Sequence, residues 1–213
     1  MSAEKIQGFF ESTMGQVITV AIILVLFFSI LISGKKEKMG TKSLVICAIL
    51  VALSVALGAI TLFRMPQGGS VTPFSMVPIV LAGYLYGVRR GVMVGICVGL
   101  FNLIFDLYVI HPAQLLLDYP IAFGALALGG VFRNKERLSL PFAYLFGVCC
   151  RYLCAVLSGI IFFGSFAPEG FSAVTWSLWY NMTYLGIEAI ASIIILSVPS
   201  VHHAFDRLKL EAA

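Results

Sequence analysis

The segment "HPAQLLLDYPIAF", residues 111–123, is an apolar run that carries one carboxylate, Asp118, near its centre. A charge at the centre of a bilayer costs at least ~2.5 kcal/mol on insertion scales, so a membrane helix retains an acid only for a specific purpose. His111, Gln114 and Asp118 follow the i, i+3, i+7 spacing and share one helical face, which alanines continue further along. The segment therefore predicts a membrane helix with one polar face.

The composition of the whole chain is that of a membrane protein. Its 213 residues are 60% hydrophobic and 11% charged, and the mean hydropathy is +1.01. A soluble domain carries about 25% charged residues. The net charge of +4 is spread in short basic clusters between apolar runs, which excludes a nucleic-acid-binding domain. No hydrolase, metalloprotease or nucleotide-binding motif occurs, so the sequence predicts neither an enzyme nor a metal site.

Polar breaks divide the apolar sequence into seven predicted helices. They are expected at residues 14–33, 43–63, 73–87, 91–109, 112–131, 140–163 and 175–198. About 20 apolar residues span a bilayer as a helix, and the third predicted helix is the shortest. The first run lacks a cleavage pattern and is followed by "GKKEK", so we expect a retained membrane helix rather than a signal peptide. The predicted fold class is an all-α integral membrane protein.

Basic residues in alternate connections predict the orientation, because cytoplasmic loops are enriched in Lys and Arg. These residues are Lys35, Lys36, Lys38, Lys42, Arg89, Arg90, Arg133, Lys135, Arg137, Arg207 and Lys209. The pattern predicts an N-terminus outside the cell and a C-terminus in the cytoplasm. The connections at 64–72, 108–112 and 164–174 are then external.

Polar groups on three predicted helices are expected to face one chamber in the outer half of the membrane. At 1.5 Å per residue, Asp118 lies only ~9 Å below the start of its helix, and Asn181 and Ser158 lie at comparable depths. Asp118 has no basic residue one turn away, which favours a role toward a ligand. Pro120 cannot donate to the carbonyl of Leu116, so the helix is expected to bend nearby.

Other intramembrane polar residues have simpler interpretations. Arg151 and Glu188 lie at similar depth and are interpreted as a structural ion pair, with ligand contact as the alternative. Asp106 lies near the outer end of its helix and is interpreted as solvated. Asn181 and Tyr184 are expected to face the ligand, and interhelical hydrogen bonds are the alternative.

The external loop "RMPQGGSVTP", residues 64–73, is expected to be either a lid over the chamber or a plain connection. Gly68 and Gly69 allow a positive φ and close approach of the backbone. Aromatic residues crowd the outer ends of the last two helices: Phe162, Phe163, Phe166, Phe171, Trp176, Trp179 and Tyr180. An interfacial belt explains some of these. Rings beside a carboxylate also suit a flat, cationic or nitrogen-rich ligand.

Four segments resemble one family of transport proteins. "MPQGGSV", "HPAQLLLDYPIAF", "RYLCAVLSGIIFFGSFAPEG" and "YNMTY" are similar to the thiamine-binding S-components of energy-coupling factor (ECF) transporters, the ThiT type, over roughly residues 43–198. The resemblance implies a six-helix bundle in a bacterial plasma membrane that captures a vitamin on its outer face. It also implies docking on a transmembrane scaffold subunit with two ATPase subunits. The vitamin would be the transported ligand, and no cofactor is implied.

The resemblance also implies a division of the chain. Residues 1–40 would form an extra N-terminal transmembrane helix with a basic linker, and residues 41–213 the six-helix substrate-binding domain. The first core helix would meet the scaffold through Ala48, Ala52 and Ala56, because alanines every four residues let helices approach closely. Packing within the bundle is the alternative use of these alanines.

The ligand contacts implied by the resemblance are carried over one residue at a time. Asp118 and Tyr119 match the family's acid, usually a glutamate, and its neighbouring tyrosine, while Asn181 matches its asparagine. Where the family has a tyrosine, a tryptophan and a histidine, this sequence has Trp176, Phe163 and Ala155. Tyr184, Gln67 and Gly68 complete the predicted contacts.

The missing histidine at Ala155 bears on the choice of ligand. Thiamine is the expected ligand, and a pyrimidine precursor or a vitamin B6 vitamer is the alternative in the same class. A membrane scaffold or assembly subunit without a ligand is the alternative in another class.

Overall fold

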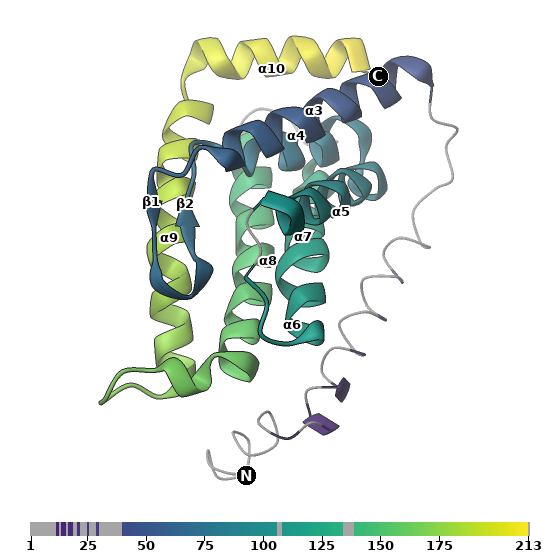
Figure 1. Ribbon diagram of the computed structural model, residues 1–213. Helices are drawn as coiled ribbons and strands as arrows, with labels where there is room; N and C mark the ends of the chain where they lie inside the picture. The colour runs from purple at the N-terminus through teal and green to yellow at the C-terminus, as the bar shows by residue number, and fades with distance from the viewer. Residues whose placement is uncertain are drawn as a thin grey trace.

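The computed structural model describes residues 40–105, 108–133 and 139–212, together with isolated positions between 12 and 29 (Figure 1). The predicted first helix, over 14–33, and the predicted N-terminal domain, over 1–40, lie almost wholly outside the described residues. Asp106 and the basic residues at 35, 36, 38, 135 and 137 lie outside them as well.

Helices make up nearly all of the described chain. The long ones are α3 (Thr41–Ala59), α5 (Val88–Phe105), α8 (Ser139–Phe162) and α9 (Ala173–Leu196), and shorter ones are α4 (Val77–Tyr86) and α10 (Pro199–Ala212). Between α5 and α8, four consecutive short pieces form one composite span: α6 (Pro112–Leu116), the π-helix η2 (Leu117–Ile121), α7 (Ala122–Leu126) and the 3-10 helix η3 (Ala127–Phe132).

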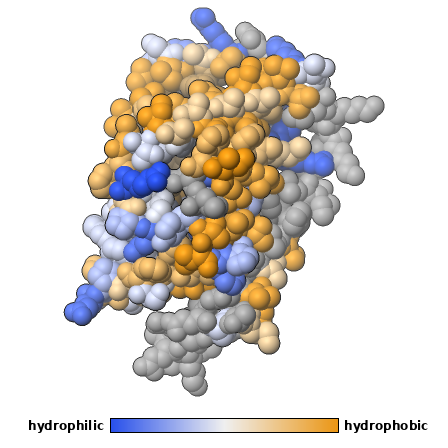
Figure 2. Space-filling model, in the orientation of Figure 1, coloured by the Kyte–Doolittle hydropathy of each residue, from blue (hydrophilic) through white to orange (hydrophobic). Residues whose placement is uncertain are grey.

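Five of these elements can cross a membrane by length and composition, within the described part of the chain. They are α3, α5, the composite span, α8 and α9. The helix predicted over 73–87 corresponds to α4, which has 10 residues and is indeed short. Large apolar side chains such as Leu153, Ile187 and Ile194 are exposed on the surface, and Figure 2 shows apolar residues over much of one face. Lipid accounts for such a surface, so the all-α membrane class is confirmed.

A small hairpin separates α3 from α4, and the sequence did not predict it. Strand β1 (Phe63–Arg64) pairs antiparallel with β2 (Ser70–Val71), and the 3-10 turn η1 (Pro66–Gly68) joins them. The helix predicted over 43–63 therefore ends at Ala59, and the one predicted over 73–87 begins at Val77. Figure 1 shows the hairpin lying lengthwise along α9.

The C-terminal segment forms α10, although no helix is predicted from the sequence after residue 198. In Figure 1, α10 runs across the end of α9. Val201 and Phe205 pack against the core. Lys209 Nζ donates a hydrogen bond to the Tyr84 hydroxyl at 3.1 Å and lies 4.6 Å from the centroid of that ring. The C-terminus is thereby fastened to α4.

The composite span is held by a close approach of α5. A Cβ atom built on Gly99 would lie 2.7 Å from the carbonyl oxygen of Tyr119, and one on Gly95 would collide with the backbone of Phe123 and Gly124. Any larger residue would push the two elements apart, since backbone atoms cannot move aside as a flexible side chain can. This contact positions the segment that carries Asp118.

Candidate ligand-binding site

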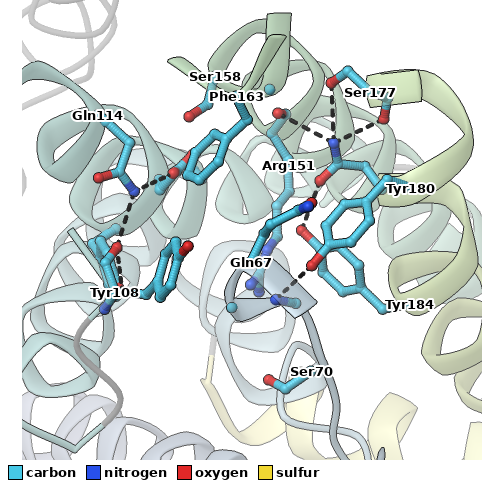
Figure 3. A pocket seen from close by; sticks show the side chains of 18 of the residues that line it. Gln67, Ser70, Tyr108, Gln114, Arg151, Ser158, Phe163, Ser177, Tyr180 and Tyr184 are labelled. Atoms are coloured by element: carbon cyan, nitrogen blue, oxygen red, sulfur yellow. Dashed lines mark hydrogen bonds between the residues drawn. The ribbon is translucent and has the colours of Figure 1, made fainter. Parts of the chain in front are cut away.

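A cavity of about 140 Å³ lies between the hairpin, the composite span, α8 and α9 (Figure 3). All of the predicted ligand contacts line it: Gln67, Gly68, Asp118, Tyr119, Phe163, Trp176, Asn181 and Tyr184. These residues come from separate parts of the sequence, so the fold brings together side chains that were predicted from shared helical faces and from the family resemblance. Their contact with a ligand stays a prediction.

Asp118 is presented to the cavity by a π-helical turn. Pro120 lies inside this turn, Leu117–Ile121. Its ring nitrogen cannot donate, so the α-helical hydrogen-bond pattern breaks here, and such π-turns are frequent at functional sites. The sequence predicted a bend near Pro120, and the structure has a widened, π-helical turn there.

A neighbouring amide orients the carboxylate of Asp118. Gln114 Nε2 donates to Asp118 Oδ2 at 2.6 Å and to the carbonyl of Tyr108 at 3.2 Å. Gln114 Oε1 accepts from the backbone N–H of Ile110 at 3.2 Å. Because Gln114 is only 2% exposed and is held on both sides, it fixes the direction of the carboxylate before any ligand arrives.

Arg151 lies at the floor of the cavity, and its predicted ion pair with Glu188 is not formed. The guanidinium carbon of Arg151 lies 4.0 Å from the centroid of the Phe123 ring, a cation–π contact. Glu188 instead accepts hydrogen bonds from Thr72, Ser75 and the backbone of Met76. The sequence could not show this, because the donors belong to a connection far away in the chain.

Asn181 links α8 to α9 at the wall of the cavity. Its Nδ2 donates to the carbonyl of Ser177 at 2.8 Å and to the carbonyl of Ala155 at 3.3 Å. Its Oδ1 accepts from the hydroxyl of Tyr184 at 2.9 Å. The interhelical hydrogen bond that was the alternative interpretation is thus present, at a residue that also faces the cavity.

Aromatic rings flank the cavity on two sides. On α9, the centroid of Trp176 lies 5.8 Å from that of Tyr180, which lies 5.9 Å from that of Tyr184. On the other side, Phe163 stacks with Tyr108 at 6.0 Å and an interplanar angle of 21°. Trp179 is 61% exposed, as expected for a residue of an interfacial belt.

The hairpin is fastened over the cavity by Tyr180. The Tyr180 hydroxyl donates to the carbonyl of Pro66 and accepts from the backbone N–H of Gly69 at 3.0 Å (Figure 3). Gly68 has a φ of +88°, and a Cβ on Gly69 would lie 2.7 Å from the Tyr180 oxygen. The two glycines thus serve the two purposes expected of them, a positive φ and a close approach. The hairpin has the position of a lid.

Comparison with known proteins relates this architecture to one family. Residues 44–206 match the family described as thiamine transporter protein (Thia_YuaJ), which is well over half of the chain. The chain belongs to the thiamine transporter family. The resemblance seen in the sequence is thereby confirmed, and a member of this family is a transport protein rather than an enzyme.

Known thiamine transporters are similar to this chain in sequence and in fold. A thiamine transporter ThiT of Bacillus subtilis (strain 168) is 38% identical over 164 residues, covering 70% of this chain and 85% of the relative. A thiamine transporter ThiT of Lacticaseibacillus paracasei is 26% identical over 135 residues, covering 58% of this chain and 63% of the relative. A solved structure of ThiT from Listeria monocytogenes has the same fold, with a TM-score of 0.63 and 24% identity, covering 75% of this chain and 96% of that one.

Several cavity residues of this thiamine transporter family member were not predicted as ligand contacts. They include Ser70, Asn102, Tyr108, Gln114, Ser177 and Tyr180, whereas Ser158 was expected to face this chamber and Arg151 had ligand contact as its alternative interpretation. Gln114 and Ser177 stand on the polar faces that the sequence revealed, whereas Asn102 and Tyr108 carry no such signal. Ser158 is 1% exposed and lies near Asp118, and within the described residues its hydroxyl is otherwise without a partner, so it offers a ligand a donor. In the described ranges, no group of three or more His, Cys, Asp or Glu side chains can hold a metal ion.

Proposed function

We propose that this chain is the thiamine-binding S-component of an ECF-type vitamin transporter. Family membership supports the class of ligand, and one observation supports the site: the cavity combines a carboxylate, Asp118, with an amide, Asn181, between two groups of aromatic rings. Thiamine has an aminopyrimidine and a cationic thiazolium. A carboxylate accepts hydrogen bonds from an exocyclic amine, and aromatic faces attract a cation.

The proposed capture uses the residues around the cavity in three roles. Asp118 accepts from the exocyclic amine, and Asn181, positioned by Tyr184, fixes the pyrimidine. Tyr119, Phe163 and Trp176 contact the faces of the rings. The hairpin closes the cavity, with its tip at Gln67 and Gly68.

A related vitamin is the second candidate ligand, and Ala155 favours it. Ala155 lines the cavity where the family resemblance implies a histidine, so a hydrogen-bonding group is missing and space is gained. Purification from cells grown in rich medium, followed by mass spectrometry of the co-purified small molecule, tests the two ligands. We expect thiamine. A vitamin B6 vitamer or a pyrimidine precursor in its place would reassign the substrate.

Docking on a transmembrane scaffold with two ATPases is proposed as the source of energy. Ala48, Ala52 and Ala56 are all exposed on α3, which supports an external partner rather than packing within the bundle. Co-expression with a scaffold and its ATPases, followed by co-purification, tests this partnership. Stable complexes together with no calorimetric heat from thiamine or B6 vitamers would instead favour a ligand-free assembly subunit.

The proposed orientation has the N-terminus outside and the C-terminus in the cytoplasm. In support, two basic residues each lie against the region at the end of α4: a Cβ on Gly87 would lie 3.6 Å from the guanidinium of Arg133, and Lys209 donates a hydrogen bond to Tyr84. Clustering of cations at one end of a membrane bundle is typical of a cytoplasmic face. Labelling of single introduced cysteines with a membrane-impermeant reagent in intact cells tests the assignment.

A further inference from the structure

Glu188 is a buried carboxylate below the ligand cavity. It is 5% exposed and accepts hydrogen bonds from Thr72 Oγ1 at 2.8 Å, Ser75 Oγ at 3.2 Å and the backbone N–H of Met76 at 3.1 Å. A buried charge is retained only where donors replace its water shell. All of these donors belong to the connection between the hairpin and α4, so Glu188 binds that connection to α9.

Helix α9 contacts the hairpin and the connection after it at three positions along its length. Tyr180 bonds the tip through Pro66 and Gly69, and Thr183 Oγ1 lies 3.2 Å from Met65 Sδ. Glu188 holds the base, two turns of α9 beyond Tyr180. The helix that carries Asn181 therefore sets the position of the whole hairpin relative to the cavity.

The network around Glu188 continues to α3. Ser54 Oγ of α3 donates to the carbonyl of Ser75 at 2.6 Å, and Thr72 Oγ1 lies 2.7 Å from Ser75 Oγ. Ser54 is 1% exposed. At about 100° per residue, it lies on the side of α3 opposite Ala52 and Ala56, the proposed docking face.

Open space next to the network allows it to move. A second cavity of about 40 Å³ is lined by Ser54, Thr72, Ser75 and Glu188, and it shares Arg151 with the ligand cavity. In a fully packed core, residues 72–76 could not shift without collisions. Met76 is 0% exposed and packs in the core, so the open space adjoins only the polar part of this connection, which the hydrogen bonds to Glu188 hold in place.

We propose that Glu188 is a positioning residue for ligand capture, which anchors the base of the hairpin and ties its position to α3. With the base fixed, opening is confined to the tip that Tyr180 holds. Loss of the anchor releases the hairpin along its full length, and the ligand leaves faster. The ligand-dependent part of this inference rests on the proposed function.

The experiment compares two variants of the anchor with a matched control in the full-length protein. Thr72→Val removes one donor to Glu188 at nearly constant shape, and Glu188→Gln removes the charge. Ser192→Ala is the control: it lies one turn further along α9, is 0% exposed, and its hydroxyl lies near Tyr144 and has no partner in the connection at residues 72–76. Hydrogen exchange of the hairpin is measured without ligand, and thiamine dissociation by stopped-flow tryptophan fluorescence.

Both anchor variants are expected to speed exchange of residues 63–71 and thiamine dissociation by about tenfold, the effect of losing a hydrogen bond to a charged group. Exchange in α8 should stay unchanged, and Ser192→Ala should match the wild type. Wild-type exchange of the hairpin in Thr72→Val would overturn the proposal, as would an equal rise in every helix. If Glu188→Gln does not fold, the hairpin exchange of Thr72→Val alone tests the proposal. A wild type that does not bind thiamine refutes the proposed function, whereas hairpin exchange still decides the role of Glu188.

Discussion

The side-chain amide of Gln114 donates a hydrogen bond to the carboxylate of Asp118 at 2.6 Å, across one turn of the helical span that lines the cavity. This bond explains how an apolar helix tolerates an acid. A carboxylate can accept about four hydrogen bonds, so one from Gln114 leaves capacity for a ligand. The carboxylate is therefore directed by the protein yet still able to bind.

Asp118→Ala is expected to weaken thiamine binding more than tenfold, by over ~1.4 kcal/mol, because the acceptor for the exocyclic amine is lost. Isothermal titration of the purified protein measures the change. Glu169→Ala, which removes an exposed acid from the loop between α8 and α9, serves as the control. Unchanged affinity in Asp118→Ala would remove this residue from the site.

Ala155→His is expected to tighten thiamine binding by about fivefold, through one additional hydrogen bond worth ~1 kcal/mol. Ala155 lines the cavity together with Ser158 and Gly159, so the histidine side chain is expected to enter it there. Ala155→Leu fills similar space without a polar group and should not tighten binding. Weaker thiamine binding by the histidine variant would favour a different natural ligand.

Tyr180→Phe is expected to lower thiamine affinity by about tenfold, since the hydroxyl that fastens the hairpin at Pro66 and Gly69 is removed. The ring and its contact with Trp176 remain. Tyr152→Phe is the matched control, because it deletes a hydroxyl that bonds the carbonyl of Leu178 at 3.0 Å between α8 and α9. Equal affinities for the two variants would argue against the hairpin as a lid.

Gly99→Ala is expected to destabilise the protein by about 1–3 kcal/mol, because the new methyl group would meet the backbone of Tyr119 and Pro120. Thermal unfolding in detergent reports the loss. Gly58→Ala, where a Cβ inside α3 makes only ordinary contacts at 3.8 Å with Asn102 and 3.9 Å with Ser75, should not lower the melting temperature. A wild-type melting temperature for Gly99→Ala would mean that α5 and the composite span can separate at little cost.

Ala52→Leu is expected to abolish co-purification with the scaffold subunit while thiamine binding persists, because a larger side chain prevents close approach of two helices. Ala191→Leu makes the same change at an exposed alanine of α9 and should leave the complex intact. Retention of the complex by Ala52→Leu would place the docking face elsewhere.

The spans and the cavity walls could be predicted from the sequence because both follow regular patterns. Apolar runs give the helices, and the polar stripes at a helical period give Gln114, Asp118, Ser177 and Asn181. Family resemblance added Trp176, whose aromatic character alone fits an interfacial belt equally well.

Other features lack a local pattern. Each strand of the hairpin has 2 residues, too few for an alternation to appear. Helix α10 mixes polar and apolar residues, so it does not stand out as an apolar run. The hydrogen-bond partners of Glu188 belong to a connection more than 100 residues earlier in the chain. The residues next to Glu188 in the sequence do not indicate these partners.

The π-turn at Leu117–Ile121 adds one residue to the circumference of a helix. One residue corresponds to about 100° of rotation about the helix axis. The side chains before the turn therefore point in directions that differ by about this angle from those of an uninterrupted α-helix. Of the α5 glycines, Gly95 contacts the later part at Phe123 and Gly124 and Gly99 contacts the turn at Tyr119 and Pro120, while Gln114 belongs to the earlier part. Substitutions in the earlier part, at or near Gln114, therefore change the surroundings of Asp118 without rebuilding the helix packing that keeps the protein folded.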